Sequence, residues 1–186
     1  MTTIDLTKST SVFSIKEKAI RITWNLCWSL ATLLPRQLSD IRIVLLRIFG
    51  AKIGKKCLID HGVKIWIPWN LNIENFVAIG RYVEIYNYGM VTIGTMTVIS
   101  QYSYLCTGSH EYENPYMPLI WDKIIIGSEC WIAAGTCILP GVIIGNGSVI
   151  GAKSLVTKNM PEWMVCAGHP CKPIKIRKLN KPLDSI

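Results

Sequence analysis

His110 is the residue of this chain with the clearest potential for chemistry. It lies in the polar stretch CTGSHEYENP, residues 106–115, between two regular runs of aliphatic residues. A neutral imidazole can accept the proton of an attacking hydroxyl group, and Glu111, Glu113 or a backbone carbonyl could hold its second nitrogen. A loop histidine that only bonds its own backbone fits the same residues. The residues alone leave both interpretations open.

The other histidines and the cysteines do not predict a metal centre. His61 and His169 are far from His110 in the sequence, whereas a zinc enzyme of the carbonic anhydrase kind needs three histidine ligands, two of them close together. The seven cysteines are an odd number without a CxxC pair, which argues against both a zinc site and a disulfide framework. We therefore expect no metal and a reducing environment. The N-terminus lacks the features of an export signal, so we expect the protein in the cytoplasm.

An aliphatic residue returns every six positions along most of the chain. A period of six matches neither an α-helix nor the alternation of β-hairpins. Small or polar residues follow the aliphatic ones, which favours short strands joined by tight corners, three to a coil, with coils stacked about 4.8 Å apart. The pattern therefore predicts an all-β main domain, a parallel β-helix. The positions are Ile126, Ile132, Ile138, Ile144, Ile150 and Val156, preceded by Ile73, Ile79, Ile85, Val91, Ile93, Ile99 and Leu105 and by a fainter set, Ile53, Ile59 and Ile65.

The repeat breaks once around His110. The spacing from Leu105 to Ile126 is not a multiple of six, so the chain leaves the coil and returns to it. We expect a protruding loop at residues 106–121 that carries His110. A loop of this length in a compact repeat protein is usually functional or disordered.

The two ends of the chain have a different character. Helical spacing over residues 14–34 and 38–49, broken by Pro35, predicts an N-terminal helical cap or interfacial segment at residues 1–50. The β-helix, as a catalytic domain, would occupy residues 51–165. Prolines 170 and 173 favour an extended basic C-terminal tail at residues 166–186.

The net charge of +8 is not accompanied by a nucleic-acid recognition motif, so we expect no nucleic-acid partner. Phosphates of a cofactor or an anionic membrane surface explain the charge as well. The longest apolar stretch, Ile22–Leu34, reaches only about 20 Å as a helix, too short for a bilayer core of roughly 30 Å. With Trp24 and Trp28 on one face it could lie in a membrane interface; packing on the main domain or on a neighbouring subunit explains it equally.

Several segments resemble the hexapeptide-repeat O-acetyltransferases, in particular the colanic acid biosynthesis acetyltransferases, which are related to the maltose and nodulation acetyltransferases. These segments are WNLCWSL (24–30), IWIPWNL (65–71), YNYG (86–89), YLCTGSHEYENPYMPLI (104–120), CWIAAGTCILPGVIIGNGSVIGAKSLVTKNMP (130–161) and AGHPCKPIK (167–175). The resemblance implies a left-handed coil and direct transfer of the acetyl group of acetyl-CoA to a sugar hydroxyl, with His110 as general base. The acceptor would be a free or lipid-linked saccharide, such as a precursor of exopolysaccharide, O-antigen or glycolipid.

The resemblance also assigns roles to other residues. Asn87 replaces an aspartate that lies beneath the acceptor in the maltose enzymes, and Trp131 matches a tryptophan that lines the thioester pocket. A homotrimer is implied, with the site between subunits and possible membrane contact through the N-terminal helices. Further candidates are Tyr86, Glu111 and Glu113 for the acceptor, Ala133, Ala134, Gly151 and Ala152 for the pantetheine arm, and Thr157, Lys158 and Lys172 for the nucleotide phosphates.

A hypothesis from another class is a non-catalytic β-helix, a scaffold subunit of a polysaccharide or membrane assembly. It predicts no affinity for CoA and no effect of changing His110.

Overall fold

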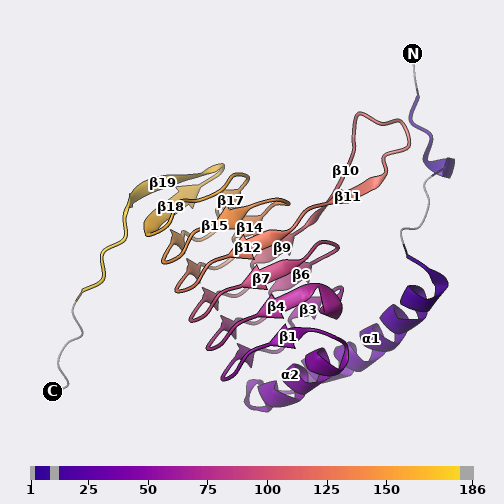
Figure 1. Cartoon of the computed structure of the whole chain (residues 1–186), viewed down its shortest axis with the longest axis horizontal. Helices are drawn as coiled ribbons and strands as arrows, with labels where there is room; N and C mark the ends of the chain where they lie inside the picture. Colours follow the sequence, from indigo (N-terminus) through magenta and orange to yellow (C-terminus); the bar gives the residue numbers. More distant parts are fainter. Residues whose placement is uncertain (1–2, 9–12, 181–186) are drawn as a thin grey trace.

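Short parallel strands stack into a three-sided prism that makes up most of the molecule (Figure 1). The structure, a computed structural model, describes residues 3–8 and 13–180. The strands form three sheets, here called A, B and C, and the chain runs through one strand of A, then B, then C in each coil. The predicted all-β parallel β-helix is therefore confirmed.

The sheets are composed as follows. Sheet A holds β1 (Lys52–Ile53), β4 (Leu71–Ile73), β7 (Val91–Ile93), β12 (Ile124–Ile126) and β15 (Ile143–Ile144). Sheet B holds β2 (Leu58–Ile59), β5 (Ala78–Ile79), β8 (Val98–Ile99), β13 (Trp131–Ile132), β16 (Val149–Ile150), β18 (Met164–Gly168) and β19 (Cys171–Ile176). Sheet C holds β3 (Lys64–Ile65), β6 (Glu84–Tyr86), β9 (Tyr104–Cys106), β14 (Cys137–Ile138) and β17 (Leu155–Val156).

The six-residue repeat places an aliphatic side chain of each strand inside the prism. In sheet B, parallel pairing aligns Ile59, Ile79, Ile99, Ile132 and Ile150 in one column, and all five are 0% exposed. Burying a side chain of this size contributes roughly 1.5 to 3 kcal/mol. The core is continuous because each coil covers the next.

The closeness of the coils explains the corner glycines. The Gly127 N–H donates to Ile144 O in the next coil, at 2.8 Å. A Cβ atom on Gly127 would lie 2.5 Å from Asn146 Oδ1 and 2.8 Å from Asn146 N. A side chain at this position would push the two coils apart.

Two N-terminal helices cover one end of the prism (Figure 1). Helix α1 spans Ile15–Leu33 and α2 spans Ser39–Ile48, close to the predicted helical ranges. Ser14 caps α1, since its Oγ accepts from the Glu17 N–H and the Glu17 carboxylate accepts from the Ser14 N–H. Short 3-10 turns lie at Leu6–Lys8 (η1), Arg36–Leu38 (η2) and Pro68–Asn70 (η3).

Side chains of these helices donate to the carbonyl groups at the open edge of the first coil. In later coils such carbonyls accept backbone N–H groups of the preceding coil. The first coil has no coil before it; instead Trp24 Nε1 donates to Ile65 O and Trp28 Nε1 donates to Val63 O, both at 2.8 Å. The helices thus supply hydrogen-bond donors to the free carbonyl groups at the edge of the prism, and they also cover its core.

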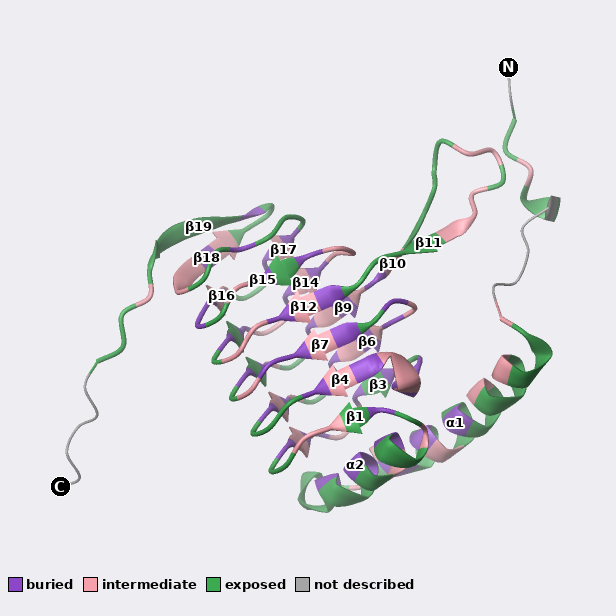
Figure 2. Cartoon of the chain, in the orientation of Figure 1, coloured by how far each residue is buried: buried purple, intermediate pink, exposed green. Residues whose placement is uncertain are grey.

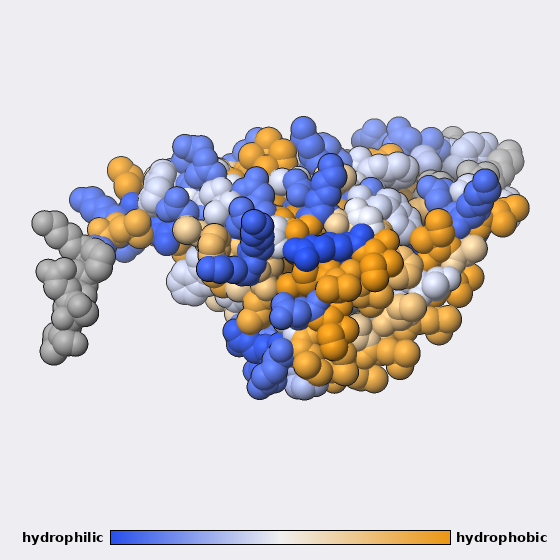
Figure 3. Space-filling view, turned by 60° about the horizontal axis from the view of Figure 1, so that its bottom comes forward, coloured by the Kyte–Doolittle hydropathy of each residue, from blue (hydrophilic) through white to orange (hydrophobic). Residues whose placement is uncertain are grey.

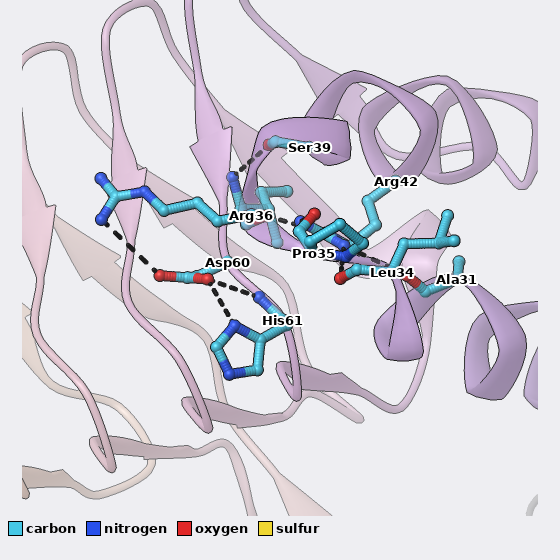
Figure 4. A network of polar contacts seen from close by, with 9 residues as sticks. Ala31, Leu34, Pro35, Arg36, Ser39, Arg42, Asp60 and His61 are labelled. Atoms are coloured by element: carbon cyan, nitrogen blue, oxygen red, sulfur yellow. Dashed lines mark hydrogen bonds and ion pairs between the residues drawn. The ribbon is translucent and has the colours of Figure 1, made fainter.

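Arg42 is a fully buried charged residue of this cap, with 0% of its surface exposed (Figure 4). Its Nε donates to Ile59 O of β2 at 2.8 Å, and its Nη1 donates to Leu34 O at 2.8 Å. Further bonds run from Nη1 to Ala31 O and from Nη2 to Pro35 O, both at 3.2 Å. One guanidinium therefore ties together β2, the end of α1 and the turn that leads to α2.

The outward faces of α1 and α2 are exposed to solvent (Figure 2) and carry many apolar side chains (Figure 3). Trp24 and Trp28 are buried against the prism, so of the two interpretations of these residues, packing on the main domain holds. No helix of the described segments is long and apolar enough to cross a bilayer. The exposed aliphatic residues are Ile15, Ile20, Ile22, Leu26, Leu30 and Leu33 on α1, Leu38 in η2, and Ile41, Val44 and Ile48 on α2.

The far end of the prism is closed by a hairpin. Strand β18 adds to sheet B in parallel beside β16, and β19 returns antiparallel to β18. The predicted tail boundary at residue 165 falls inside β18, so the tail prediction is corrected for residues 166–176. Pro170 lies in the turn between the two strands, and Pro173 is compatible with β19 because this strand lies at the edge of the sheet.

Candidate active site

A two-stranded arm projects from the prism between sheets C and A (Figure 1). The chain leaves the coil after β9 and returns at β12 (Ile124–Ile126), so the arm spans residues 107–123, close to the loop predicted at residues 106–121. Strands β10 (Gly108–His110) and β11 (Leu119–Trp121) pair antiparallel, with His110 opposite Leu119. Most of the arm is exposed (Figure 2). His110 therefore lies on an ordered hairpin that stands away from the prism.

The imidazole of His110 is exposed and held in one orientation. Its Nδ1 lies 2.6 Å from the carbonyl oxygen of Met117. A carbonyl can only accept, so Nδ1 carries the hydrogen in this contact, and in the neutral ring Nε2 has a free lone pair. Of the partners considered for the second nitrogen, the structure has the backbone carbonyl. The arrangement meets the geometric requirement for a general base acting through Nε2.

Glu111 and Glu113 lie at the exposed tip of the arm and do not hold the imidazole. Glu111 Oε2 accepts from Asn114 Nδ2 at 3.2 Å, and the Glu111 N–H donates to Pro118 O at 3.1 Å. Glu111 therefore shapes the tip, which in turn presents the Met117 carbonyl to His110.

Asn87 has a structural role in place of the predicted catalytic one. The residue is 0% exposed. Its Oδ1 accepts from the Ile67 N–H at 3.0 Å, and its Nδ2 donates to Ile67 O at 2.6 Å and Asn70 O at 3.1 Å. Because the amide group is fully used inside the molecule, Asn87 cannot orient an acceptor. It fills the enlarged corner that produces the slip between Val91 and Ile93 in the repeat.

Aromatic rings line the side of the prism beneath the arm. The Tyr88 ring has three aromatic neighbours. Its centroid lies 5.0 Å from that of Tyr86, 5.4 Å from that of Phe13 and 6.4 Å from that of Trp121. Tyr86 also contacts Trp66 edge to face, at 4.8 Å. Burial, with a smaller effect of Tyr88, raises the pKa of Tyr86 to about 12, so its hydroxyl keeps its proton near neutral pH.

An open cavity of about 630 Å³ lies at the foot of the arm. Four segments far apart in the sequence meet there: the start of α1, two successive corners between sheets C and A, and the returning strand of the arm. The lining residues are Phe13 and Glu17, Ile67, Trp69 and Asn70, Tyr88, Gly89 and Met90, and Trp121, Asp122 and Lys123. The wall thus combines aromatic faces with two carboxylates and an ammonium group.

Most of the predicted CoA-binding residues gather around the corner between sheets B and C. Ala133 and Gly151 follow β13 and β16 in adjacent coils, and their N–H groups donate to Ile150 O and Cys166 O, at 2.9 and 2.8 Å. Both amides are therefore occupied. In the described part of the chain, the next residues, Ala134 and Ala152, make no hydrogen bond through their N–H groups.

Two further predicted residues lie close to this corner. The Trp131 side chain is 49% exposed on the face of sheet B, and its Nε1 donates to Ser100 Oγ at 3.0 Å. Lys172 pairs with Ala167, whose Cβ would lie 2.8 Å from a Cβ on Gly151. The structure therefore brings Trp131, Ala133, Ala134, Gly151, Ala152 and Lys172 to one side of the prism.

Thr157 and Lys158 are not part of that group. They follow β17 and are exposed at the corner between sheets C and A, the corner from which the arm of the same chain rises. Within one chain, His110 and the predicted pantetheine residues thus lie at different corners.

Known proteins share the six-residue repeat and much of the sequence of this chain. The family described as bacterial transferase hexapeptide (six repeats) matches residues 123–158. The protein named colanic acid biosynthesis acetyltransferase WcaF, from Escherichia coli (strain K12), is 41% identical over 158 residues, which are 85% of this chain and 87% of that protein. The chain belongs to the hexapeptide-repeat acetyltransferases.

Solved structures of other acetyltransferases share the fold of this family member. The hexapeptide-repeat acetyltransferase VCA0836 of Vibrio cholerae O1 biovar eltor, solved with acetyl-CoA, has a TM-score of 0.80 and 24% identity and covers 90% of this chain and 92% of that one. A maltose O-acetyltransferase from Clostridium difficile 630 has a TM-score of 0.81 and 22% identity and covers 89% and 90%.

The cavity at the foot of the arm of this acetyltransferase is not evident from the sequence. Glu17, Trp121 and Asp122 cannot be grouped from the sequence because their segments lie far apart in it. One feature of the sequence does point to the cavity: Trp121 and Asp122 lie in the same break of the repeat as His110, near its end.

Proposed function

We propose that this acetyltransferase moves the acetyl group of acetyl-CoA to a hydroxyl of a saccharide, with His110 as the general base. The observation that carries the proposal is the bond from His110 Nδ1 to Met117 O, which leaves Nε2 as a proton acceptor. The 41% identity to WcaF, a protein named for colanic acid biosynthesis, supports a saccharide acceptor used in polysaccharide or glycolipid synthesis.

In the proposed reaction, His110 Nε2 takes the proton of the acceptor hydroxyl as its oxygen attacks the thioester carbonyl carbon. A C–O bond forms and the C–S bond breaks, so the sulfur leaves with the bonding electrons. The imidazolium returns the proton to the sulfur. No acyl-enzyme is required, and general-base catalysis of this kind contributes about 10² to 10⁴ in rate.

The corner between sheets B and C fits a pantetheine arm. Ala134, Gly151 and Ala152 are small and at least partly exposed there, beside the buried Ala133, and the N–H groups of Ala134 and Ala152 supply donors. Trp131 offers an apolar ring for the thioester, and Lys172 a charge for the phosphates. Thr157 and Lys158 would act at the nucleotide end only across a subunit boundary.

The separation of the arm from this corner supports a homotrimer. His110 of one chain lies at a different corner from the predicted pantetheine residues of that chain. We propose that the arm of one subunit faces the CoA groove of its neighbour around a threefold axis, so that each site uses two chains. Tyr86, Glu111 and Glu113 would then approach the acceptor from the side of the arm.

A thiol-release assay tests the proposed function. The enzyme is incubated with acetyl-CoA and with neutral hexoses, maltose, nucleotide-linked sugars and lipid-linked sugars in parallel. Release of CoA that depends on one saccharide class is expected. A protein that neither binds CoA nor releases it with any acceptor would instead fit the scaffold hypothesis.

We further propose that α1 and α2 rest on an anionic membrane surface. Five of the six exposed aliphatic residues of α1 recur every three to seven residues and form one stripe opposite the buried tryptophans; they are Ile15, Ile22, Leu26, Leu30 and Leu33. Residues 13–56 contain nine lysines and arginines against two acidic residues, a net charge of +7 out of the chain's +8. Apolar stripes bordered by basic residues are typical of interfacial helices.

Charge reversal within the stripe tests this contact. The double variant Leu26→Glu and Leu30→Glu should bind phosphatidylglycerol-containing vesicles at least about tenfold more weakly than the wild type, because apolar burial is lost and repulsion is added. Cosedimentation measures the binding. Ile174→Glu with Ile176→Glu, on the equally exposed β19, is the matched control and should bind like the wild type. Equal weakening in both double variants would refute the proposed surface.

A further inference from the structure

The cavity at the foot of the arm is placed to hold the acceptor of the proposed reaction. Residues directly opposite each other in an antiparallel pair point to the same side, and so do alternate residues of one strand. Gly108 is paired with Trp121 and His110 with Leu119. Trp121 and His110 therefore share one face of the arm, about 7 Å apart along the strand direction.

That face looks toward the aromatic rings of the prism. A Cβ atom on Gly108 would lie 2.7 Å from Tyr86 Cε1 and 3.7 Å from Tyr88 Cδ2. The Trp121 and Tyr88 ring centroids are 6.4 Å apart, and both residues line the cavity. The indole is 49% exposed, so one of its surfaces is available to a ligand.

The polar groups of the cavity suit a hydroxylated ligand. Asp122 Oδ1 accepts from the Lys123 N–H at 2.7 Å, and Glu17 Oε2 accepts from Ser14. Each carboxylate has a second oxygen that can accept a hydroxyl proton.

Arg21 places a positive charge beside the aromatic wall of the cavity. It follows Glu17 by one helical turn, and its guanidinium lies 4.0 Å from the Phe13 ring centroid and 5.8 Å from that of Tyr88. Among the described residues, its Nε is the buried side-chain nitrogen or oxygen that has no hydrogen-bond partner. Arg21 is not among the residues that line the cavity, so its contribution is a positive charge held next to two of the lining rings.

We propose that this cavity is the acceptor subsite, in which a neutral pyranose lies against the Trp121 indole and bonds through its hydroxyls to Glu17 and Asp122. The inference rests on the proposed function and adds to it the place and class of the acceptor. It gives α1 a part in acceptor recognition, because Phe13 and Glu17 come from its start. The hydroxyl to be acetylated is the one directed along the arm toward His110.

The test compares two neighbouring residues of β11. Trp121→Ala removes the aromatic face of the cavity, whereas Ile120→Ala changes the adjacent residue, which is similarly exposed but points to the other side of the arm. Saturation-transfer NMR against maltose and methyl glycosides of common neutral hexoses measures binding without turnover. Thiol release with the saccharide that binds best measures KM for each substrate.

In Trp121→Ala we expect the acceptor KM to rise roughly tenfold with a matching loss of the NMR signal, while KM for acetyl-CoA stays within about twofold. Trp121→Phe, which keeps an aromatic face, should recover most of the loss, and Ile120→Ala should behave like the wild type. Absence of saccharide binding to the wild type, or equal behaviour of Trp121→Ala and Ile120→Ala, would overturn the subsite. Binding that depends on Trp121 without acetyl transfer would instead refute the proposed function and leave the subsite standing.

Discussion

The His110→Ala enzyme should turn over about 10² to 10⁴ times more slowly than the wild type, with nearly unchanged KM for acetyl-CoA. The imidazole is the only group on the inner face of β10 that can accept the hydroxyl proton, since Gly108 has no side chain. CoA binding should persist because the predicted pantetheine residues lie at another corner of the prism. The measurement is thiol release under saturating acetyl-CoA, together with calorimetric titration of CoA.

Two variants of the same arm are the controls. Tyr112→Phe changes an exposed residue at the tip and should keep the kcat of the wild type within a fewfold. His110→Asn keeps a polar side chain without a comparable base and should be as impaired as His110→Ala. His110 is exposed, so neither His110 variant should lose more than about 0.5 kcal/mol of stability. A His110→Ala enzyme with wild-type kcat would remove His110 from the mechanism.

Arg42→Met should destabilise the protein by about 3 to 5 kcal/mol. The substitution removes the donors to Ile59 O and Leu34 O at the junction of the cap with the prism. A buried carbonyl left without a donor costs about 1 to 3 kcal/mol, and Arg42 serves four carbonyls in all, the other two being Ala31 O and Pro35 O. Denaturant unfolding followed by circular dichroism, at fixed protein concentration, measures the loss.

Arg47 provides the matched comparison for Arg42. Its guanidinium also donates to carbonyls of the first coil, to Ile53 O at 2.9 Å and Gly54 O at 2.8 Å, but it is exposed. Water can replace its bonds, so Arg47→Met should cost about 1 kcal/mol or less. Equal losses in the two variants would show that burial of the guanidinium does not determine the stability of the cap.

The repeat itself was predictable because its signal is local. Each hexad needs one aliphatic residue inside and a small one at the corner, so positions such as Ile132 and Gly127 reveal the coil without reference to the rest of the chain. The break between Leu105 and Ile126 located the arm for the same reason. The hairpin of β10 and β11 and the partner of His110 depend on contacts across the loop, and spacing does not contain them.

The role of Asn87 could not be predicted because it depends on one distant contact. Its amide bonds Ile67, which lies in the preceding coil, and a sequence position gives no measure of burial. A surface asparagine and a buried one look the same in the sequence. The exchange of an aspartate for an amide at this position suits a buried site, since burying a carboxylate costs more than burying an amide.

The N-terminal helices show a related limit. Helix α1 is apolar on two opposite sides, so its periodicity predicts a helix but does not tell which side packs on the prism. The side that packs on the prism is the one with Trp24 and Trp28, because their indole N–H groups donate to free carbonyl groups of the first coil. The aliphatic stripe is left outside, and this changes which residues are expected to touch a membrane.

Transfer of a labelled acetyl group tests the central claim most directly. The wild type and His110→Ala are incubated with acetyl-CoA carrying carbon-13 in its acetyl group and with the saccharide that promotes thiol release, and the sugar product is examined by NMR and mass spectrometry. We expect a labelled acetyl ester on one sugar hydroxyl with the wild type and, in the same time, at most about one hundredth of it with the variant. Equal amounts of the ester from both proteins, or label retained on the protein as an acyl-enzyme, would contradict direct transfer with His110 as the base.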